Sequence, residues 1–360
     1  MISAWFNPTV ATMNGLGMSP HRTRTDLRPV NVPTYAGLRT RTDAPPGSSW
    51  GLFGAHDQLG TLNFLAFNDL RAAASEIQAG QAFSLDLPST AINPSLAPTR
   101  RPVEHHIFER TPFHRDEWLD HFYTQYGSQL DGLRHIGHPE HGFYNGADPR
   151  LFLPGEDLLG IHHIAALPVA GRAVLLDVDR HLRDQGRPIQ QHSDFAVSAR
   201  DLEETRAAQD VTVRPGDIVL IRFGWLRWYL EDASPQVRAD LRTEQFHPGL
   251  EQSHDVLAWL WDHQVSLIAA DNFALERWPA APDSPFYTHA ERDEGFRDPH
   301  SGIMHRAIIG LLGMPIGELW NLDALAASCA ADRRWSLLLT VAPLSIVGGI
   351  GSPANAIALR

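Results

Sequence analysis

One turn-rich segment carries an aspartate and three histidines, all able to bind a metal ion, at intervals of three or four residues. In GSQLDGLRHIGHPEHGFYNG (residues 127–146), Asp131 is followed by His135, His138 and His141. Carboxylates and imidazoles are common ligands of Zn²⁺ and other divalent ions, and an imidazole also exchanges protons near neutral pH. The pattern therefore indicates a metal site or acid–base chemistry, with a set of structural histidines as the alternative.

The composition excludes several classes of protein. The chain has 360 residues, of which 43% are hydrophobic and 20% are charged, as in ordinary globular proteins. Its formal net charge of −12 argues against nucleic acid and anionic membranes as partners. The single cysteine, Cys329, excludes an intrachain disulfide framework and a cysteine-rich zinc site. Because no apolar run is long enough to span a membrane and the first residues carry no secretory signal, we expect a cytoplasmic protein.

The elements that must position these side chains can be predicted from capping residues, amphipathic spacing and short apolar runs behind turns. Helices are predicted at 69–78, 198–209, 254–264 and 303–314. Strands are predicted at 81–89, 171–178, 216–225, 265–271 and 333–347, with a strand and then a turn at 315–325 and a last strand near the C-terminus.

These elements divide the chain into two parts. Residues 1–46 are rich in Pro, Thr, Arg and Gly and show little periodicity, so we expect an irregular N-terminal arm that covers a neighbouring subunit. Residues 47–360 contain neither a repeat nor a linker, and their alternating helices and strands indicate a single α/β domain.

Several blocks of the chain resemble the cyclase family of metal-dependent hydrolases. They are WGLFGAHDQLGTLNFL, TQYGSQLDGLRHIGHPEHGFYNG, GRAVLLDV, VRPGDIVLIRFGW, HRAIIGLLGMPIGELWNL and GGIGSPANAIAL, in this order from Trp50 to the C-terminus. The family includes bacterial kynurenine formamidase and isatin hydrolase, and the chain is most similar to its longer branch. The resemblance implies a mixed, strongly curved, barrel-like sheet of the swivelling β/β/α type, flanked by helices. It also implies a homodimer or a homotetramer.

The family signature is a His, three residues, a His, one residue, an Asp, three residues and a final His. These positions fall on Gln125, Gln129, Asp131 and His135 of this sequence, and the later His and Glu of the family fall on His305 and Glu318. The resemblance therefore implies a metal site made by Gln129, Asp131, His305 and Glu318, with His135 as the catalytic acid–base group and Gln125 nearby.

Two glutamines thus replace two histidines of the signature. A glutamine can bind a cation only through its neutral carbonyl oxygen, which is a harder and weaker donor than imidazole. The replacement favours one bound divalent ion over two, with Mn²⁺ or Zn²⁺ as the expected ions and Mg²⁺ as a further candidate. It also leaves two roles open for His135, a proton shuttle or a metal ligand that substitutes for the missing histidines.

Four further residues are candidates for the wall of the pocket. His138 and His141 continue the histidine series, His163 follows another histidine, and Asp271 ends a predicted strand.

The chemistry that this set supports is hydrolysis of an amide, a cyclic imide or a lactone or other ester by a metal-activated water. The expected substrate is a small molecule, aromatic or hydrophobic. Two alternatives remain, a metal-dependent lyase or cyclase, and a metal-free binding member of the family.

Overall fold

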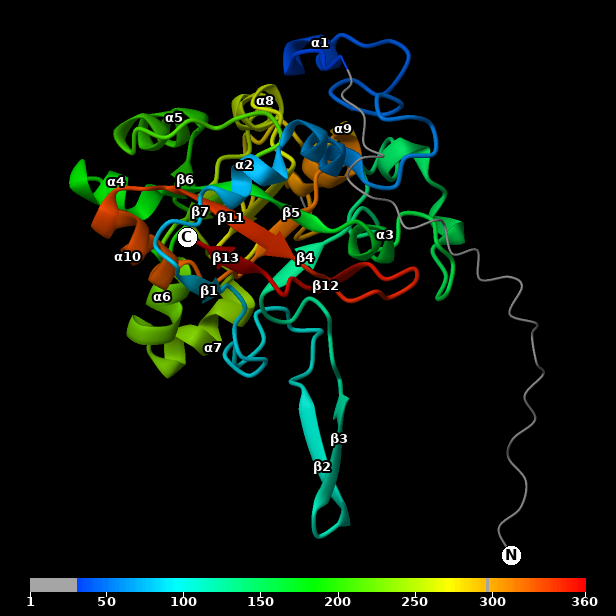
Figure 1. The fold of residues 1–360 in the computed structure, drawn as a ribbon. Helices are drawn as coiled ribbons and strands as arrows, with labels where there is room; N and C mark the ends of the chain where they lie inside the picture. The colour runs from blue at the N-terminus through cyan, green and yellow to red at the C-terminus, as the bar shows by residue number, and fades with distance from the viewer. Residues whose placement is uncertain (1–30, 296–297) are drawn as a thin grey trace, which may run out of the picture.

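The computed structural model describes residues 31–295 and 298–360 (Figure 1). The first 30 residues of the predicted N-terminal arm lie outside the described residues. The rest of the arm includes helix α1 (Tyr35–Arg39), which lies against α8 (His254–Asp262). The backbone N–H of Tyr35 donates to Asp262 Oδ1 at 2.7 Å, and the indole of Trp261 donates to the carbonyl of Pro33 at 2.8 Å. Within the described ranges, no helix combines the length and the apolar character that crossing a membrane requires.

A nine-stranded mixed sheet curls strongly through the molecule and forms a half-barrel flanked by helices (Figure 1). Its strand order is β1-β13-β11-β5-β7-β9-β10-β4-β12. Neighbours from β5 to β10 run parallel, and the strands on either side of them pair antiparallel. This architecture confirms the predicted fold class. The strands are β1 (Ala82–Ser84), β4 (Gln129–Asp131), β5 (Val169–Asp177), β7 (Ile218–Arg222), β9 (Leu267–Ala270), β10 (Ile316–Glu318), β11 (Ser336–Val341), β12 (Gly351–Pro353) and β13 (Ile357–Leu359).

The core lies around the parallel strands. Every residue of β7 and β9 is buried, as expected for strands covered on both faces, and this explains their continuous apolar sequences. Besides α1, the α-helices are α2 (Leu70–Ala74), α3 (His162–Ala166), α4 (Val178–Asp184), α5 (Ala199–Ala208), α6 (Trp225–Arg227), α7 (Pro235–Glu244), α8, α9 (His289–Glu294) and α10 (Asp323–Asp332). The 3-10 helices are η3 (Gly60–Phe67), η4 (Tyr144–Gly146) and η5 (Pro149–Leu151), and the π-helices are η6 (Trp228–Asp232) and η7 (Arg306–Leu311).

Local sequence signals explain most of these boundaries. Helix α5 begins with a capping box between Ser198 and Asp201, and α8 begins after Ser253, whose hydroxyl accepts from the N–H of Val256. Three predictions need correction. The helix predicted at 303–314 is the π-helix η7, the helix predicted at 69–78 ends at Ala74, and the turn predicted at the end of 315–325 is the start of α10.

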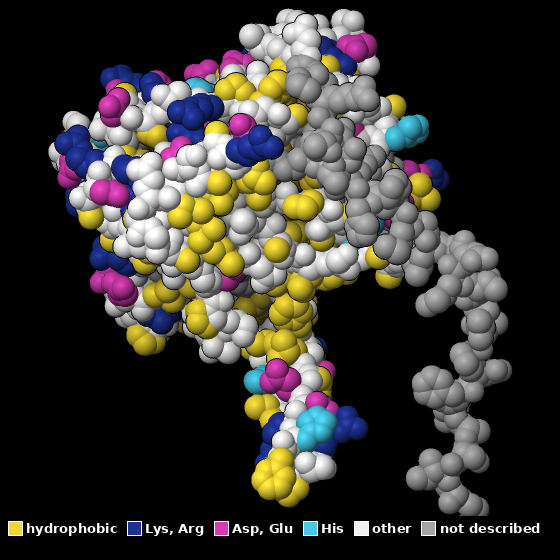
Figure 2. Space-filling view, in the orientation of Figure 1, with side chains coloured by type: hydrophobic (Ala, Val, Ile, Leu, Met, Phe, Trp, Pro, Cys, Tyr) yellow, Lys and Arg dark blue, Asp and Glu magenta, His cyan; other side chains and the backbone are white. Residues whose placement is uncertain are grey.

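Two small sheets lie outside the main one. Strands β6 (Ala196–Val197) and β8 (Gly249–Leu250) form a short parallel pair. Strands β2 (Glu104–Thr111) and β3 (His114–Asp120) form a hairpin that extends away from the body (Figures 1 and 2). Most of its residues are exposed, and Phe113 at the tip is 99% exposed.

Candidate functional site

Strand β4 brings two of the predicted ligands to one face of the sheet. It pairs antiparallel with β10, with Gln129 opposite Glu318. Because side chains alternate along a strand, Gln129 and Asp131 point to the same side. The Gln129 Nε2 atom lies 2.8 Å from Glu318 Oε2 and 3.3 Å from Asp131 Oδ2. The amide of Gln129 therefore lies between two buried carboxylates.

His305 joins this group from the residue before η7. Its Nε2 atom lies 3.1 Å from Glu318 Oε1, and its Nδ1 atom lies 2.7 Å from Glu276 Oε1. The Glu276 carboxylate also accepts the backbone N–H groups of Met304 (2.7 Å) and His305 (2.9 Å). Glu276 thus fixes the His305 ring with Nε2 directed toward Glu318, as the outer partners of metal-binding histidines do.

The sequence analysis did not identify Glu276. Its only sequence signal is an acidic residue in the apolar stretch FALERW, since a buried carboxylate needs a partner. The loop that carries it holds Ala274 (φ 77°) and Leu275 (φ 55°) in the left-handed region, which is unfavourable for both residue types. Such backbone is typical of functional sites.

The site concentrates negative charge in the protein interior. Asp131, Glu276 and Glu318 are at most 3% exposed, and Asp131, His305 and Glu318 each offer a ligand atom within 4.8 Å of the others. Burial raises the pKa of Asp131, and the nearby Glu318 adds to this. Burial alone would lower the pKa of His305, but its hydrogen bonds to Glu276 and Glu318 raise it to about 10. The buried carboxylates of Asp131 and Glu318 therefore strongly favour a positive charge between them.

The donor set fits a divalent metal ion. Gln129 Oε1 is buried and has no hydrogen-bond partner among the described residues, while its Nε2 faces both carboxylates. A half-turn of the amide exchanges the two atoms and directs Oε1 toward the carboxylates, which is the orientation that a cation between them requires. Two carboxylates, one imidazole and one amide oxygen form a ligand set that suits Mn²⁺ or Zn²⁺.

His135 lies beside this group, at the turn after β4. Its Nε2 atom is 3.9 Å from Asp131 Oδ2, and its side chain is 23% exposed. Gln125 donates from Nε2 to Asp131 Oδ1 and also lies 3.2 Å from His135 Nδ1. Burial lowers the pKa of His135, with the neighbouring Asp131 acting in the opposite direction.

A cavity of about 580 Å³ opens onto these residues. Its apolar wall is formed by Ile136, Phe273, Trp278 and Ile303. Arg242 also lines it, and the buried Nε atom of this guanidinium has no hydrogen-bond partner among the described residues. The other polar groups facing the cavity include Arg100, Gln129, His135, His300, His305 and Glu318.

The remaining predicted pocket residues lie elsewhere. His138 and His141 line a different cavity, and His163 lies in α3 with its Nε2 atom 2.8 Å from the carbonyl of Asp157. Asp271 accepts the backbone N–H groups of Phe223 (2.7 Å) and Gly224 (2.8 Å), and burial raises its pKa to about 8. Its position indicates that it holds the loop after β7.

Comparison with known proteins is consistent with this architecture. The Cyclase family model matches residues 85–277, whereas a search of curated proteins found no match. A crystal structure described as a novel cyclase is 30% identical over 87% of this chain and 99% of its own, with a TM-score of 0.73. An isatin hydrolase bound to the product analogue thioisatinate is 17% identical over 81% of this chain and 97% of its own, with a TM-score of 0.51. Isatin hydrolase A from Ralstonia solanacearum has the same identity and coverage and a TM-score of 0.53.

The two isatin hydrolases share the fold with this chain, at an identity too low to transfer their activity. The family match covers residues 85–277, which include β4 with Asp131, and the novel cyclase structure is 30% identical over 87% of the chain. This protein belongs to the cyclase family.

Proposed function

We propose that the protein is a metal-dependent hydrolase that cleaves an amide, a cyclic imide or a lactone or other ester in a small substrate with an aromatic or hydrophobic part. The observation that carries the proposal is the buried group of Asp131, His305 and Glu318 at the base of a large cavity, next to the unsatisfied Gln129 Oε1. The fold shared with isatin hydrolases supports a hydrolytic reaction.

Asp131, Glu318, His305 and Gln129 would hold the ion in this proposal. A divalent ion held by these residues supplies a Lewis acid that activates water and polarises the substrate carbonyl. Glu276 keeps the Nδ1 proton of a neutral His305, which leaves the Nε2 lone pair free on the side of Glu318. Gln125 donates to Asp131 and so holds this carboxylate in place.

His135 is positioned for proton transfer rather than for ion binding. It lines the cavity and lies outside the group whose ligand atoms come within 4.8 Å of one another. In this role His135 accepts a proton from the attacking water and returns it to the leaving group. The other role, a metal ligand, would require the ring to move inward toward Asp131.

The cavity wall indicates the kind of substrate. Phe273 and Trp278 offer aromatic surfaces, and Arg242 offers a buried N–H group that has no hydrogen-bond partner in residues 31–295 and 298–360. An unpaired guanidinium N–H at a cavity suits a carboxylate or another anionic oxygen. We therefore expect a ring or acyl group against the aromatic wall and an anionic substituent at Arg242.

A substrate panel tests the proposal. Formamides, cyclic imides and lactones, each with and without a carboxylate substituent, are incubated with protein loaded with Mn²⁺ or Zn²⁺. Turnover in H₂¹⁸O should place one ¹⁸O atom in the product carboxylate. Product without ¹⁸O would favour the lyase or cyclase alternative. Protein that binds neither ion would favour the metal-free binding alternative.

A further inference from the structure

The histidine-rich segment serves two cavities. His135 lines the main cavity, whereas His138 and His141 line a second cavity of about 320 Å³. The π-helix η7 lies between them, because His305 before η7 faces the main cavity and Ala307 and Leu311 face the second one. The packing is close, since a Cβ atom on Gly310 would lie 2.9 Å from the backbone N of His138.

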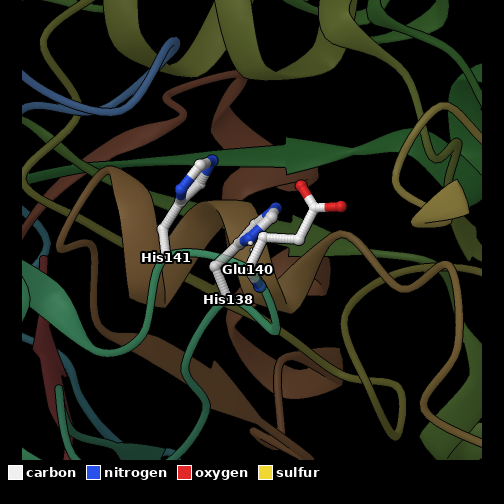
Figure 3. A group of neighbouring side chains, drawn as sticks. All are labelled: His138, Glu140 and His141. Carbon is white, nitrogen blue, oxygen red and sulfur yellow. Dashed lines mark hydrogen bonds between the residues drawn. The ribbon is translucent and has the colours of Figure 1, made fainter. Parts of the chain in front are cut away.

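Three side chains of this segment gather in the second cavity. His138, Glu140 and His141 each offer a ligand atom, and these atoms lie within 4.8 Å of one another. The two imidazole rings are stacked, with centroids 4.6 Å apart, and Glu140 extends beside His138 (Figure 3). Two imidazoles and one carboxylate with an open position form the ligand pattern of many protein zinc sites.

The backbone holds these residues in place without a metal ion. His138 N donates to Gly142 O at 2.8 Å, and Gly142 N donates to His138 O at 2.7 Å, which closes a tight turn. The N–H of Glu140 donates to His138 Nδ1 at 3.2 Å, a hydrogen bond that metal binding by this ring would replace. Burial, with nearby His141 adding to it, lowers the pKa of His138 to about 4, so the ring is neutral at pH 7 as a metal ligand must be.

The second cavity also receives imidazoles from other elements. His254 at the start of α8 and His289 at the start of α9 both line it. His254 Nδ1 lies 3.0 Å from the hydroxyl of Tyr35, whereas neither ring nitrogen of His141 forms a hydrogen bond with the described residues. The cavity therefore offers up to four imidazoles and one carboxylate.

In two other groups of the described chain the potential ligand atoms also lie within 4.8 Å of one another, but these atoms already contact other polar groups of the protein. In the group of Asp157, His162 and His163, His163 Nε2 contacts the Asp157 carbonyl and His162 Nδ1 accepts the N–H of Gly348. In the group of Glu104, His106 and Asp120 on the hairpin, His106 Nε2 lies 3.8 Å from Glu104 Oε2 and 3.2 Å from Asp120 Oδ2. These groups are suitable controls.

We propose that His138, Glu140 and His141 bind a second metal ion, Zn²⁺, at a site separate from the main cavity. This ion ties together the turn from His138 to His141, and the turn packs against η7 at Gly310. Because His135 is three residues from His138, the second site fixes the backbone from which the His135 ring projects. Its role is to position this loop.

The stoichiometry of Zn²⁺ binding tests the proposal. Full-length protein is stripped with a chelator and dialysed against micromolar Zn²⁺, and bound zinc is measured by mass spectrometry. Wild-type protein should bind two equivalents, the double variant Asp131→Asn/Glu318→Gln should bind one, and His141→Ala should also bind one. The control His163→Ala should bind two.

Affinity at the second site gives an independent measurement. In the Asp131→Asn/Glu318→Gln background, His141→Ala should weaken Zn²⁺ binding by more than about 100-fold, beyond the 10–100-fold that outer partners contribute. Circular dichroism confirms that each variant is folded, and His141 is an exposed residue whose removal leaves the core intact. If the double variant does not fold, the zinc content of the His141→Ala single variant still decides whether the second site exists.

The outcomes separate this proposal from the proposed function. Loss of one equivalent in His141→Ala supports the second site, whether wild-type protein binds one equivalent or two. A wild-type protein that binds only one equivalent, and loses it in His141→Ala, would support the second site and overturn the main one. Equal zinc content in wild-type protein and His141→Ala would overturn the second site.

Discussion

The two groups of potential ligands hold their ligand atoms equally close together, within 4.8 Å of one another, but the first group is buried and the second is largely exposed. The main group contains two carboxylates and one imidazole and is at most 3% exposed, whereas the second contains two imidazoles and one carboxylate in a half-exposed turn. Buried carboxylates without a cation are costly, whereas neutral imidazoles near solvent are not. The main group therefore needs a positive charge at all times, and the second can exist with or without one.

The supporting residues differ in the same way. In the main group, Glu276 and Gln125 fix the ligands through side-chain hydrogen bonds from two separate segments. In the second group the support comes from the turn itself. We expect the side chains of the main site to be fixed before an ion binds. In the second site the backbone turn is already closed, and the ion orders only the side chains.

The largest expected effect is at Asp131. Asp131→Ala removes an anionic ligand from the main cavity, so metal at this site and activity should be lost together, with activity reduced by more than about 10³-fold. This exceeds the 10–100-fold effect of outer partners. Metal content and turnover are measured on the same preparation. Full metal content with low activity would show that Asp131 is not a ligand.

The next effect is at His135. If His135 shuttles protons, His135→Ala should lower turnover by about 10²–10⁴-fold and leave the metal content nearly unchanged. If it is a ligand, excess Mn²⁺ should restore activity. The measurement is turnover against Mn²⁺ concentration, and recovery to the wild-type rate would contradict the proton-shuttle role.

A smaller effect is expected at Glu276, the residue that only the structure identified. Glu276→Gln keeps the shape of the side chain but weakens the hold on the His305 ring, so affinity for the ion in the main cavity should fall by about 10–100-fold. Titration calorimetry in the His141→Ala background isolates this site. An unchanged dissociation constant would mean that His305 is held without Glu276.

The smallest expected effect is a change in KM, tested by replacing one arginine in each cavity. Arg242→Gln should raise KM for a carboxylate-bearing substrate by about tenfold, consistent with the loss of a charged hydrogen bond. Arg39, which lines the second cavity, is the matched control, and Arg39→Gln should leave KM unchanged. Equal KM values for Arg242→Gln and the wild type would place the anionic group elsewhere.

The sequence predicted the elements whose signals are local. Buried strands such as β7 and capped helices such as α5 follow from their own residues. The π-helix η7 was predicted only as a helix, because an i→i+5 pattern has the same apolar character as an i→i+4 pattern. Helix α10 was missed because its alanine-rich sequence has no clear apolar stripe.

The site was predictable to the extent that it follows strand periodicity and the resemblance to a known family. Gln129, Asp131 and Glu318 meet because β4 and β10 pair in one register. The placement of His138 and His141 was not predictable from spacing, since the turn between His138 and Gly142 directs them to another cavity. Glu276 depends on a loop with left-handed residues, which short-range patterns do not reveal.

The geometry of the β2–β3 hairpin bears on whether residues 104–120 can be removed from the chain. Its first and last residues, Glu104 and Asp120, are paired across the ribbon, so their Cα atoms lie about 5 Å apart. Residues 104–120 can therefore be excised and the ends joined by one or two glycines without stretching the main chain. The two segments that flank the hairpin are joined below it, where Arg100, which lines the main cavity, donates to the carbonyl of Gln125. The ribbon is thus an appendage of the main body rather than a part of its core.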